Sequence, residues 1–447
     1  MRVEAAPTRG ESATASTRAR SYGAAEPRPL TDVDRGLWSA VNAGDPYPRY
    51  AELRQRGHLY KSELGLWLAL SYESVSSLLR DPRLVRGQWG EDSPPEVEEH
   101  ALLQAVRAVT TGSDARLTAQ IRQLFHDGLT GVPRSSAVKT VVTATAEKVW
   151  HNVATRGTAD IVSAVAYPFI GQVTSRLFGF TANSPQLASD AVTVVDAVST
   201  MGLIGRGARV PWRALAAAIR ANKIASDLIE LFDAELSSDG NRLAPGVLKA
   251  LAVASSDGGC THSDAVAVAL FLYFAAVITG VTFIGTSMRI LGRDLDKQHE
   301  LVNSGDKLGL AIEELLRYDP PLQMTFRTAT ECIDAFGGPI LPGDSVGLVI
   351  ASANRDPNRF LRPEELQLDR SPNPHLTFGA GDYGCLGARL ARVEATSLFE
   401  VIRNSRVRFE LAEEPDNWGV SLLHRRPSRL RLVTTRIGPG ATSGEDK

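Results

Sequence analysis

The sequence predicts a mainly α-helical protein of the α+β class, with one long central helix and small β-sheets. Apolar residues recur at helical spacing over residues 46–55, 72–80, 118–129, 137–154, 184–198 and 211–237. Short β-rich pieces lie at 58–61, 65–71, 346–349 and 430–434. Residues 265–288 contain no charged side chain, as the central helix of a large α-rich domain requires.

The stretch 265–288 is also long enough to span a bilayer. However, Asp264 precedes it, Arg289 follows it, and Thr279 and Thr282 interrupt it. We interpret it as a buried central helix and expect no transmembrane segment.

Composition favours one large domain. The chain has 447 residues and a formal net charge of −2, which indicates neither a nucleic acid nor an anionic membrane as partner. We expect a disordered N-terminal extension over 1–30, a single domain over 31–437, and a flexible tail over 438–447. The only cysteines, Cys260, Cys332 and Cys385, are few, odd in number and widely separated. They argue against a disulfide framework or a zinc site and fit a reducing cytoplasm. We expect a monomer.

The most informative segment is a glycine-punctuated loop over residues 373–392 that carries Cys385 at the start of an apolar-periodic helix. Amide groups at the N-terminus of a helix favour a thiolate. Gly381, Gly384 and Gly387 let the backbone turn tightly and approach a large, flat group, and Phe378 supplies an aromatic wall. The alternative is a buried structural cysteine, the usual fate of a free thiol.

A second motif is Glu314-Leu-Leu-Arg317, on a helix that Asp306 can cap and that Pro320-Pro321 must end. Residues three apart share a helix face, so Glu314 and Arg317 can form an ion pair. Such a pair, taken alone, is usually a solvated surface contact.

Together these motifs resemble the cytochrome P450 family. The match rests on the spacing Phe378-x-x-Gly381-x-x-x-Cys385-x-Gly387 and on the Glu-x-x-Arg helix before it. The resemblance covers about residues 45–433 and is sharpest over 313–394. It implies the triangular P450 fold and a bound haem b (iron protoporphyrin IX), with Cys385 as the iron ligand. The residues expected around the haem are Arg327, Phe378, Gly379, Tyr383 and Gly387, while Glu314 and Arg317 brace the cysteine loop.

The chain departs from the family pattern at several places. The family usually has an acid before the threonine of its central helix, whereas here Ile278 precedes Thr279. Thr279 is the expected catalytic alcohol, although it could simply hydrogen-bond to its own helix. The basic residues with which the family binds the haem propionates are replaced around Asp114 and at Tyr383. Fewer positive charges are therefore expected to neutralise the propionates. Glu365 stands where a third bracing arginine is expected, with Arg362 and Arg370 as candidate replacements.

The resemblance implies a haem-thiolate monooxygenase that uses dioxygen and electrons from a ferredoxin and its reductase. Hydroxylation, epoxidation and oxidative coupling are all open. We expect an apolar polyketide, peptide or terpenoid as substrate, in antibiotic biosynthesis, and Arg389 and Arg392 as possible ferredoxin contacts. Because the oxygen-activation residues are eroded, the alternative is a non-catalytic auxiliary protein that activates a glycosyltransferase. The expected substrate pocket comprises Ala275, Ala276, Ile278, Leu322, Gln323, Met324, Val420 and Leu422.

Overall fold

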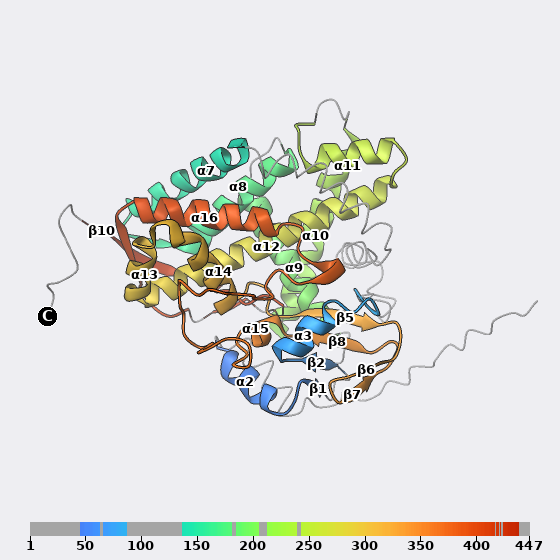
Figure 1. Cartoon of the computed structure of the whole chain (residues 1–447). Coiled ribbons are helices and arrows are strands. Elements are labelled where there is room, and N and C mark those ends of the chain that lie inside the picture. Colours follow the sequence, from blue (N-terminus) through green and yellow to red (C-terminus); the bar gives the residue numbers. More distant parts are fainter. Residues whose placement is uncertain are drawn as a thin grey trace, which may run out of the picture.

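The computed structural model describes residues 45–62, 66–86, 136–180, 185–204, 212–238, 243–415, 417–419, 421 and 423–437. Figure 1 shows a large helical part beside a smaller part that holds most of the strands. The predicted mainly helical α+β class is therefore confirmed. The predicted helix at 118–129 and both predicted disordered ends lie outside the described residues, and the single domain over 31–437 stays a prediction.

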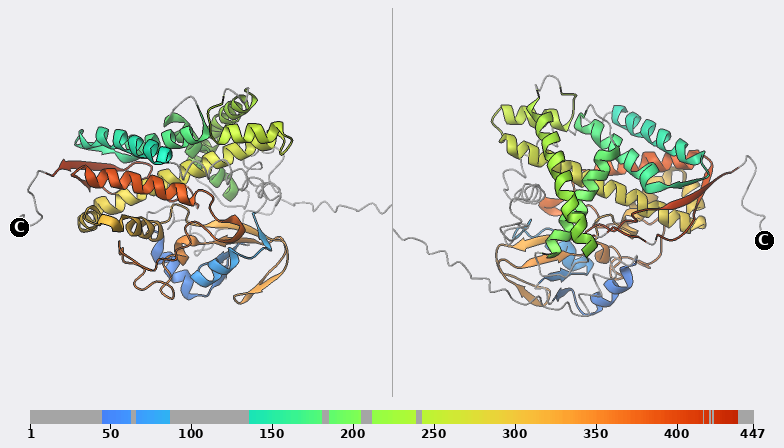
Figure 2. Two further views of the ribbon diagram at one scale, coloured as in Figure 1. Left: turned by 45° about the horizontal axis from the view of Figure 1, so that its top comes forward. Right: turned by 180° about the vertical axis from the view of Figure 1, so that it is seen from behind.

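The helical part is built from long helices that pack around one core. The described helices there are α7 (Ser136–Ala154), the π-helix η1 (Val162–Ala166), α8 (Tyr167–Phe178), α9 (Pro185–Ile204), α10 (Trp212–Ser237), α11 (Val247–Ser256), α12 (His262–Arg293), α13 (Leu295–Val302), the 3-10 helix η2 (Gly305–Lys307), α14 (Leu308–Tyr318) and α16 (Ala388–Asn404). Helix α12 contacts α8, α9, α10 and α11, while α16 packs on α7 and α14. Both views of Figure 2 show α12 running through the middle of this part.

The buried-helix interpretation of 265–288 is confirmed. Among the described helices, α12 alone is long and apolar enough to cross a membrane, yet 72% of its most apolar window is buried inside the protein. Its start follows from the sequence, because Thr261 accepts a hydrogen bond from the Asp264 backbone N–H and the Asp264 carboxylate accepts one from Thr261. This reciprocal cap satisfies two backbone donors at the helix N-terminus.

A five-stranded sheet in the order β1-β2-β8-β5-β3 forms the smaller part, together with three short helices. Its elements are β1 (Leu59–Lys61), β2 (Trp67–Ala69), β3 (Leu84–Val85), β5 (Thr325–Ala329), β8 (Ser345–Leu348), α2 (Tyr47–Gln55), α3 (Tyr72–Leu78) and α15 (Ile350–Ala353). Successive residues alternate between faces, so Leu68 joins one small core with Tyr50 and Leu53, and Ala69 joins another with Val75.

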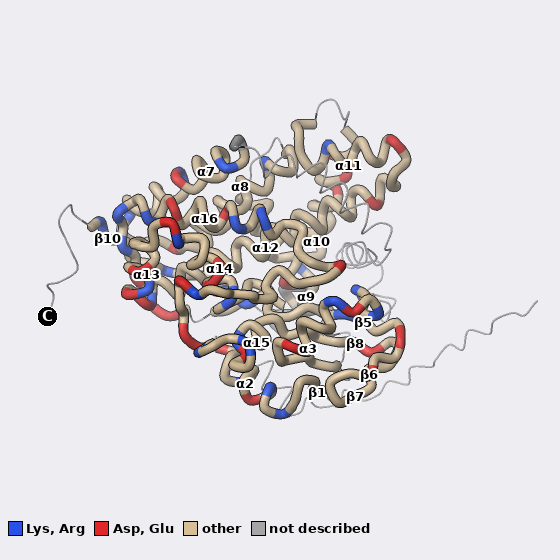
Figure 3. The backbone as a smooth tube through the Cα atoms, viewed as in Figure 1, with Lys and Arg blue, Asp and Glu red and all other residues tan. Residues whose placement is uncertain are grey.

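Two smaller sheets complete the described strands. One has the order β4-β10-β9, and the other pairs β6 with β7. The bounds are β4 (Thr158–Asp160), β6 (Ile333–Ala335), β7 (Gly338–Ile340), β9 (Val407–Leu411) and β10 (Arg431–Arg436). In the view of Figure 3, basic and acidic residues are interspersed along the described backbone, as expected for a nearly neutral chain.

One predicted cap is wrong. Asp306 was expected to cap the helix that carries Glu314, but it lies inside η2. Helix α14 begins one turn later, with Lys307 at its N-cap and no side-chain hydrogen bond there. The 3-10 turn uses the backbone groups that a cap would have satisfied, because its carbonyls and amides pair within the turn.

Candidate functional site

Within the cysteine loop, Cys385 lies between the 3-10 helix η3 (Gly381–Tyr383) and α16. The Cys385 N–H donates to the Phe378 carbonyl at 2.8 Å, which folds the loop back on itself. Gly381 has φ +66°, and a Cβ there would lie only 2.8 Å from the Leu79 carbonyl at the end of α3. Only glycine fits this close backbone approach, so the loop is held against the smaller part of the molecule.

The electrostatic setting of Cys385 differs from the expectation in one respect. Burial raises the pKa of the Cys385 thiol, while backbone N–H groups of Gly387 and Ala388 and the charge of Arg392 act to lower it. The helix N-terminus therefore acts in the predicted direction on the pKa, although the surrounding protein raises it, and Cys385 itself remains exposed. A bound metal ion would deprotonate the sulfur outright.

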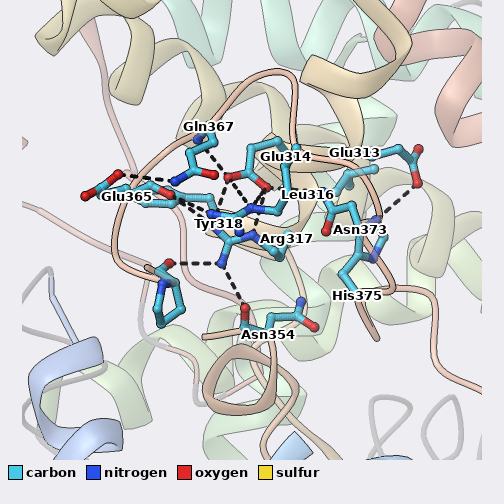
Figure 4. A network of polar contacts seen from close by, with 12 residues as sticks. Glu313, Glu314, Leu316, Arg317, Tyr318, Asn354, Glu365, Gln367, Asn373 and His375 are labelled. Atoms are coloured by element: carbon cyan, nitrogen blue, oxygen red, sulfur yellow. Dashed lines mark hydrogen bonds and ion pairs between the residues drawn. The ribbon is translucent and has the colours of Figure 1, made fainter. Parts of the chain in front are cut away.

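Glu314 and Arg317 form a fully buried ion pair, and not a surface contact. The Arg317 guanidinium donates to both carboxylate oxygens of Glu314, at 2.8 and 2.9 Å, and both side chains are completely buried. Its remaining N–H groups donate to the carbonyls of Asn354, Pro363 and Glu365 (Figure 4). Every donor is used, which is the condition for a buried charge to be tolerated.

Arg370 supplies the third arginine of this brace. Its Nε donates to both oxygens of Glu314 at 3.1 Å. Arg362 instead pairs with Glu365 at the surface, where the two side chains are 58% and 46% exposed. Of the two candidate replacements, the structure therefore selects Arg370. Asn373, which opens the cysteine segment, also donates to Glu314 at 3.1 Å, so the brace reaches directly to the loop.

A second network lies beside the first and was not expected from the sequence. Arg392 on α16 donates two hydrogen bonds to Glu313, at 2.7 and 2.8 Å, and its guanidinium lies 4.3 Å from the centre of the Phe378 ring. His375 contacts the same carboxylate at 3.1 Å. Burial alone would raise the pKa of Glu313, but His375 and Arg392 together lower it to about 2. Arg392 is thus committed to Glu313, which weakens its predicted role in ferredoxin docking.

Two alanines on helix α12 are accessible although their neighbours are buried. Ala275 is exposed and Ala276 half-buried, although Phe274 and Val277 beside them are buried. The Thr279 hydroxyl donates to the Ala275 carbonyl at 2.7 Å, so the backbone hydrogen bond considered for this residue is present. The Ala275 side chain is thus accessible in the middle of a helix whose neighbouring side chains are buried.

Three of the predicted pocket residues are buried in packed surroundings, and their place in a substrate pocket stays a prediction. Ile278 is 2% exposed and packs in the main core. Met324 packs against Tyr50 and Leu53 in a core of the smaller part. The side chain of Gln323 is fully buried and donates to Pro320 and Asp319. Leu322 is half-buried, next to another core of the smaller part, while Val420 and Leu422 lie outside the described residues.

Positive charge collects near the loop. Arg327 on β5 is 5% exposed and its guanidinium lies 4.7 Å from the centre of the Tyr383 ring. Its hydrogen bonds go to the Thr325 hydroxyl and the Phe326 carbonyl, and no carboxylate in the described part of the chain pairs with it. Burial, reinforced by the charge of Arg86, lowers the pKa of Arg327 to about 10. A buried cation without a counter-ion is expensive unless an anionic ligand neutralises it.

These residues fit a haem. The loop offers one soft sulfur donor, Cys385, backed by helix amides. Arg327, which pairs with no carboxylate among the described residues, supplies a cation near the loop, and Ala275 on α12 is accessible. A planar anionic cofactor with an iron centre would use the sulfur as a ligand, neutralise the cation and cover the accessible Ala275.

Comparisons with known proteins agree. A cytochrome P450 family model matches residues 287–430. The chain is 30% identical over 372 residues to the cytochrome P450 monooxygenase PikC of Streptomyces venezuelae, covering 81% of this chain and 84% of that protein. It is 27% identical to the biotin biosynthesis cytochrome P450 of Bacillus subtilis, covering 78% and 86%. The solved structure of the tirandamycin C-bound P450 monooxygenase TamI superposes with a TM-score of 0.74 at 26% identity, covering 88% and 98%.

Proposed function

This chain belongs to the cytochrome P450 family of haem b monooxygenases, and we propose that it inserts one oxygen atom into an apolar biosynthetic intermediate of the polyketide, peptide or terpenoid class. The observation that carries this proposal is the braced loop that carries Cys385 and whose Tyr383 contacts Arg327, with Ala275 accessible on α12. The solved relative that binds tirandamycin C supports a biosynthetic small molecule as substrate.

When bound, the haem supplies the activation of dioxygen through a cysteine-ligated iron. Within the protein, Cys385 is the only described sulfur in the loop, and the N–H groups of Gly387 and Ala388 stabilise negative charge on it. The buried Glu314–Arg317–Arg370 brace fixes the segment that leads to this sulfur. Such support keeps the Cys385 sulfur in a fixed position and orientation.

Proton delivery falls to Thr279 in our proposal. Ile278 stands where the family has an acid, and it is buried and cannot carry a proton. Because the Thr279 hydroxyl already donates its hydrogen to the Ala275 carbonyl, its oxygen can still accept a hydrogen bond from a water molecule. We propose that Thr279 orients such a water, or a hydroxyl of the substrate, as the proton source.

We propose that electrons come one at a time from a ferredoxin and its reductase. Leu386, next to Cys385, is 39% exposed, so the protein surface comes close to the sulfur at this point. Arg389 stands one turn further along and, unlike Arg392, has no acid partner in the described residues. A short path from the surface to the sulfur and a nearby cation suit an acidic electron donor.

The auxiliary, non-catalytic alternative is not favoured. That alternative is based on the missing acid and propionate-binding residues around the haem. However, the cysteine loop that such auxiliary proteins typically lose is present and is braced by two networks.

The test is turnover of the haem-loaded protein with NADPH, a ferredoxin and its reductase, using a panel of apolar biosynthetic intermediates and isotopically labelled dioxygen. Substrates are first selected by the shift of the Soret band on binding. The proposal predicts a product that carries one labelled oxygen atom and that is absent with Cys385→Ser. A tightly bound substrate that is coupled or desaturated without label would contradict oxygen insertion.

A further inference from the structure

An ion pair joins helices α14 and α16 beside the cysteine loop. Glu313 on α14 accepts two hydrogen bonds from Arg392 on α16, at 2.7 and 2.8 Å. The His375 ring contacts the same carboxylate at 3.1 Å (Figure 4), and the His375 side chain is only 3% exposed. The Glu313 carboxylate is therefore held in place by two other segments of the chain.

The Arg392 guanidinium is positioned by more than this carboxylate. It also donates to the Ala388 carbonyl at 3.3 Å, one turn earlier on α16, and it lies 4.3 Å from the centre of the Phe378 ring. An aromatic face attracts a cation at this distance. The Phe378 carbonyl in turn accepts the hydrogen bond of the Cys385 N–H at 2.8 Å. Arg392 is therefore fixed against the same loop that presents the sulfur.

The charges of this pair act on the sulfur. Burial raises the pKa of the Cys385 thiol, while the charge of Arg392 acts to lower it. Conversely, the pKa of Arg392 is raised first by its hydrogen bonds to Glu313 and to a smaller extent by the charge of Cys385. Burial acts to raise the pKa of Glu313, but His375 and Arg392 lower it to about 2, so the carboxylate is ionised at neutral pH. The sulfur thus experiences a cation whose field is opposed by a permanent anion.

We propose that Glu313 and Arg392 together set the reduction potential of the haem ligated by Cys385. Positive charge beside the sulfur stabilises the reduced iron, which carries one more negative charge, and the Glu313 carboxylate offsets part of this effect. The step concerned is the transfer of one electron from the ferredoxin to the ferric iron, with Cys385 ligated before and after it. Glu313, Arg392 and His375 are positioning residues, because they act through the sulfur.

This inference rests on haem ligation in the proposed function and not on the choice of substrate. It differs from a docking role for Arg392, because it predicts an effect on the iron in the absence of any protein partner.

The test compares variants of the full-length, haem-loaded protein without substrate. Glu313→Gln removes the anion, Arg392→Met removes the cation, the double variant removes both, and Arg392→Lys keeps the cation. Glu400→Gln is the matched control, because Glu400 lies about 12 Å further along α16 than Arg392. Glu400 pairs with Lys139 at 3.8 Å and is 34% exposed, against 25% for Glu313. The readouts are the iron midpoint potential, the ferric Soret band, and thermal unfolding by circular dichroism.

The midpoint potential should rise in Glu313→Gln and fall in Arg392→Met, because the two variants remove opposite charges. Each shift should correspond to a change of about 5- to 30-fold in the equilibrium constant for reduction. The double variant should lie between the two single variants and within about threefold of the parent protein, since both charges are gone. Arg392→Lys and Glu400→Gln should also stay within about threefold. The ferric Soret band should be the same in all variants.

The proposal is overturned if both single variants keep the parental potential or shift it in the same direction. It is also overturned if the double variant shifts further than either single variant, since a loosened loop produces that pattern together with a lowered unfolding temperature. If Glu313→Gln does not retain haem, a shift in Arg392→Lys equal to that in Arg392→Met overturns the proposal. Parent protein that binds no haem would contradict the proposed function itself, whereas a haem-bound parent whose potential ignores these charges would contradict only this inference.

Discussion

Replacing Arg370 by methionine should destabilise this protein far more than the same change at Arg362. The Arg370 side chain is 7% exposed and donates to both oxygens of the fully buried Glu314. Removing one partner of a buried ion pair costs about 3–5 kcal/mol. Since Arg317 continues to pair with Glu314, we expect the lower end of this range, about 3 kcal/mol.

Arg362→Met is the matched control. Arg362 pairs with Glu365 at the surface, where an ion pair contributes about 0–1 kcal/mol. The assay is urea unfolding of both haem-loaded variants, followed by far-UV circular dichroism, with the haem content of each preparation recorded. Haem content should fall only in Arg370→Met, because Glu314 also accepts hydrogen bonds from Gln367 and Asn373 on the path to the loop. Equal free energies of unfolding for the two variants, within 1 kcal/mol, would refute the assignment of the brace to Arg370.

Thr279→Ala should keep its haem but lower product formation at least about 10-fold, with electrons diverted to hydrogen peroxide; unchanged product per NADPH would contradict its proton role. Burial raises the pKa of Glu394 to about 8 from an ordinary 4.5. Its burial therefore costs stability increasingly as pH rises from 4.5 to 8. As the pH rises through this range, the free energy of unfolding of Glu394→Gln should increase relative to the parent protein by roughly 2–4 kcal/mol, measured by urea unfolding. A difference between the two proteins that does not change with pH would count against it. Gly381→Ala should lower haem content and the unfolding temperature more than Gly384→Ala, because only Gly381 combines φ +66° with a backbone atom 2.8 Å from the added Cβ; equal losses would refute the close-approach argument.

Sequence reasoning succeeded where the interaction is local. Glu314 and Arg317 are three residues apart on one helix, so their pairing follows from helix geometry. The central helix likewise follows from its own composition, an uncharged run over residues 265–288. The loop glycines also follow from a local requirement, since φ at Gly381 is positive.

It failed where the answer depends on distant segments. Arg370 reaches Glu314 from 56 residues away, and nothing in the spacing distinguishes it from Arg362. The sequence likewise does not show that Met324 packs against Tyr50 and Leu53, which lie about 270 residues earlier in the chain. The Glu313–Arg392 pair joins two helices whose packing appears only in the folded protein.

The central claim is that Cys385 ligates a haem iron in a braced loop. The most direct measurement is the absorption spectrum of the dithionite-reduced protein under carbon monoxide, recorded for the parent chain and for Cys385→Ala. Thiolate ligation predicts a strongly red-shifted Soret band in the parent chain that is lost in the variant. A parent chain that folds, is supplied with haem and remains colourless would contradict the account, as would a red-shifted band that survives in Cys385→Ala.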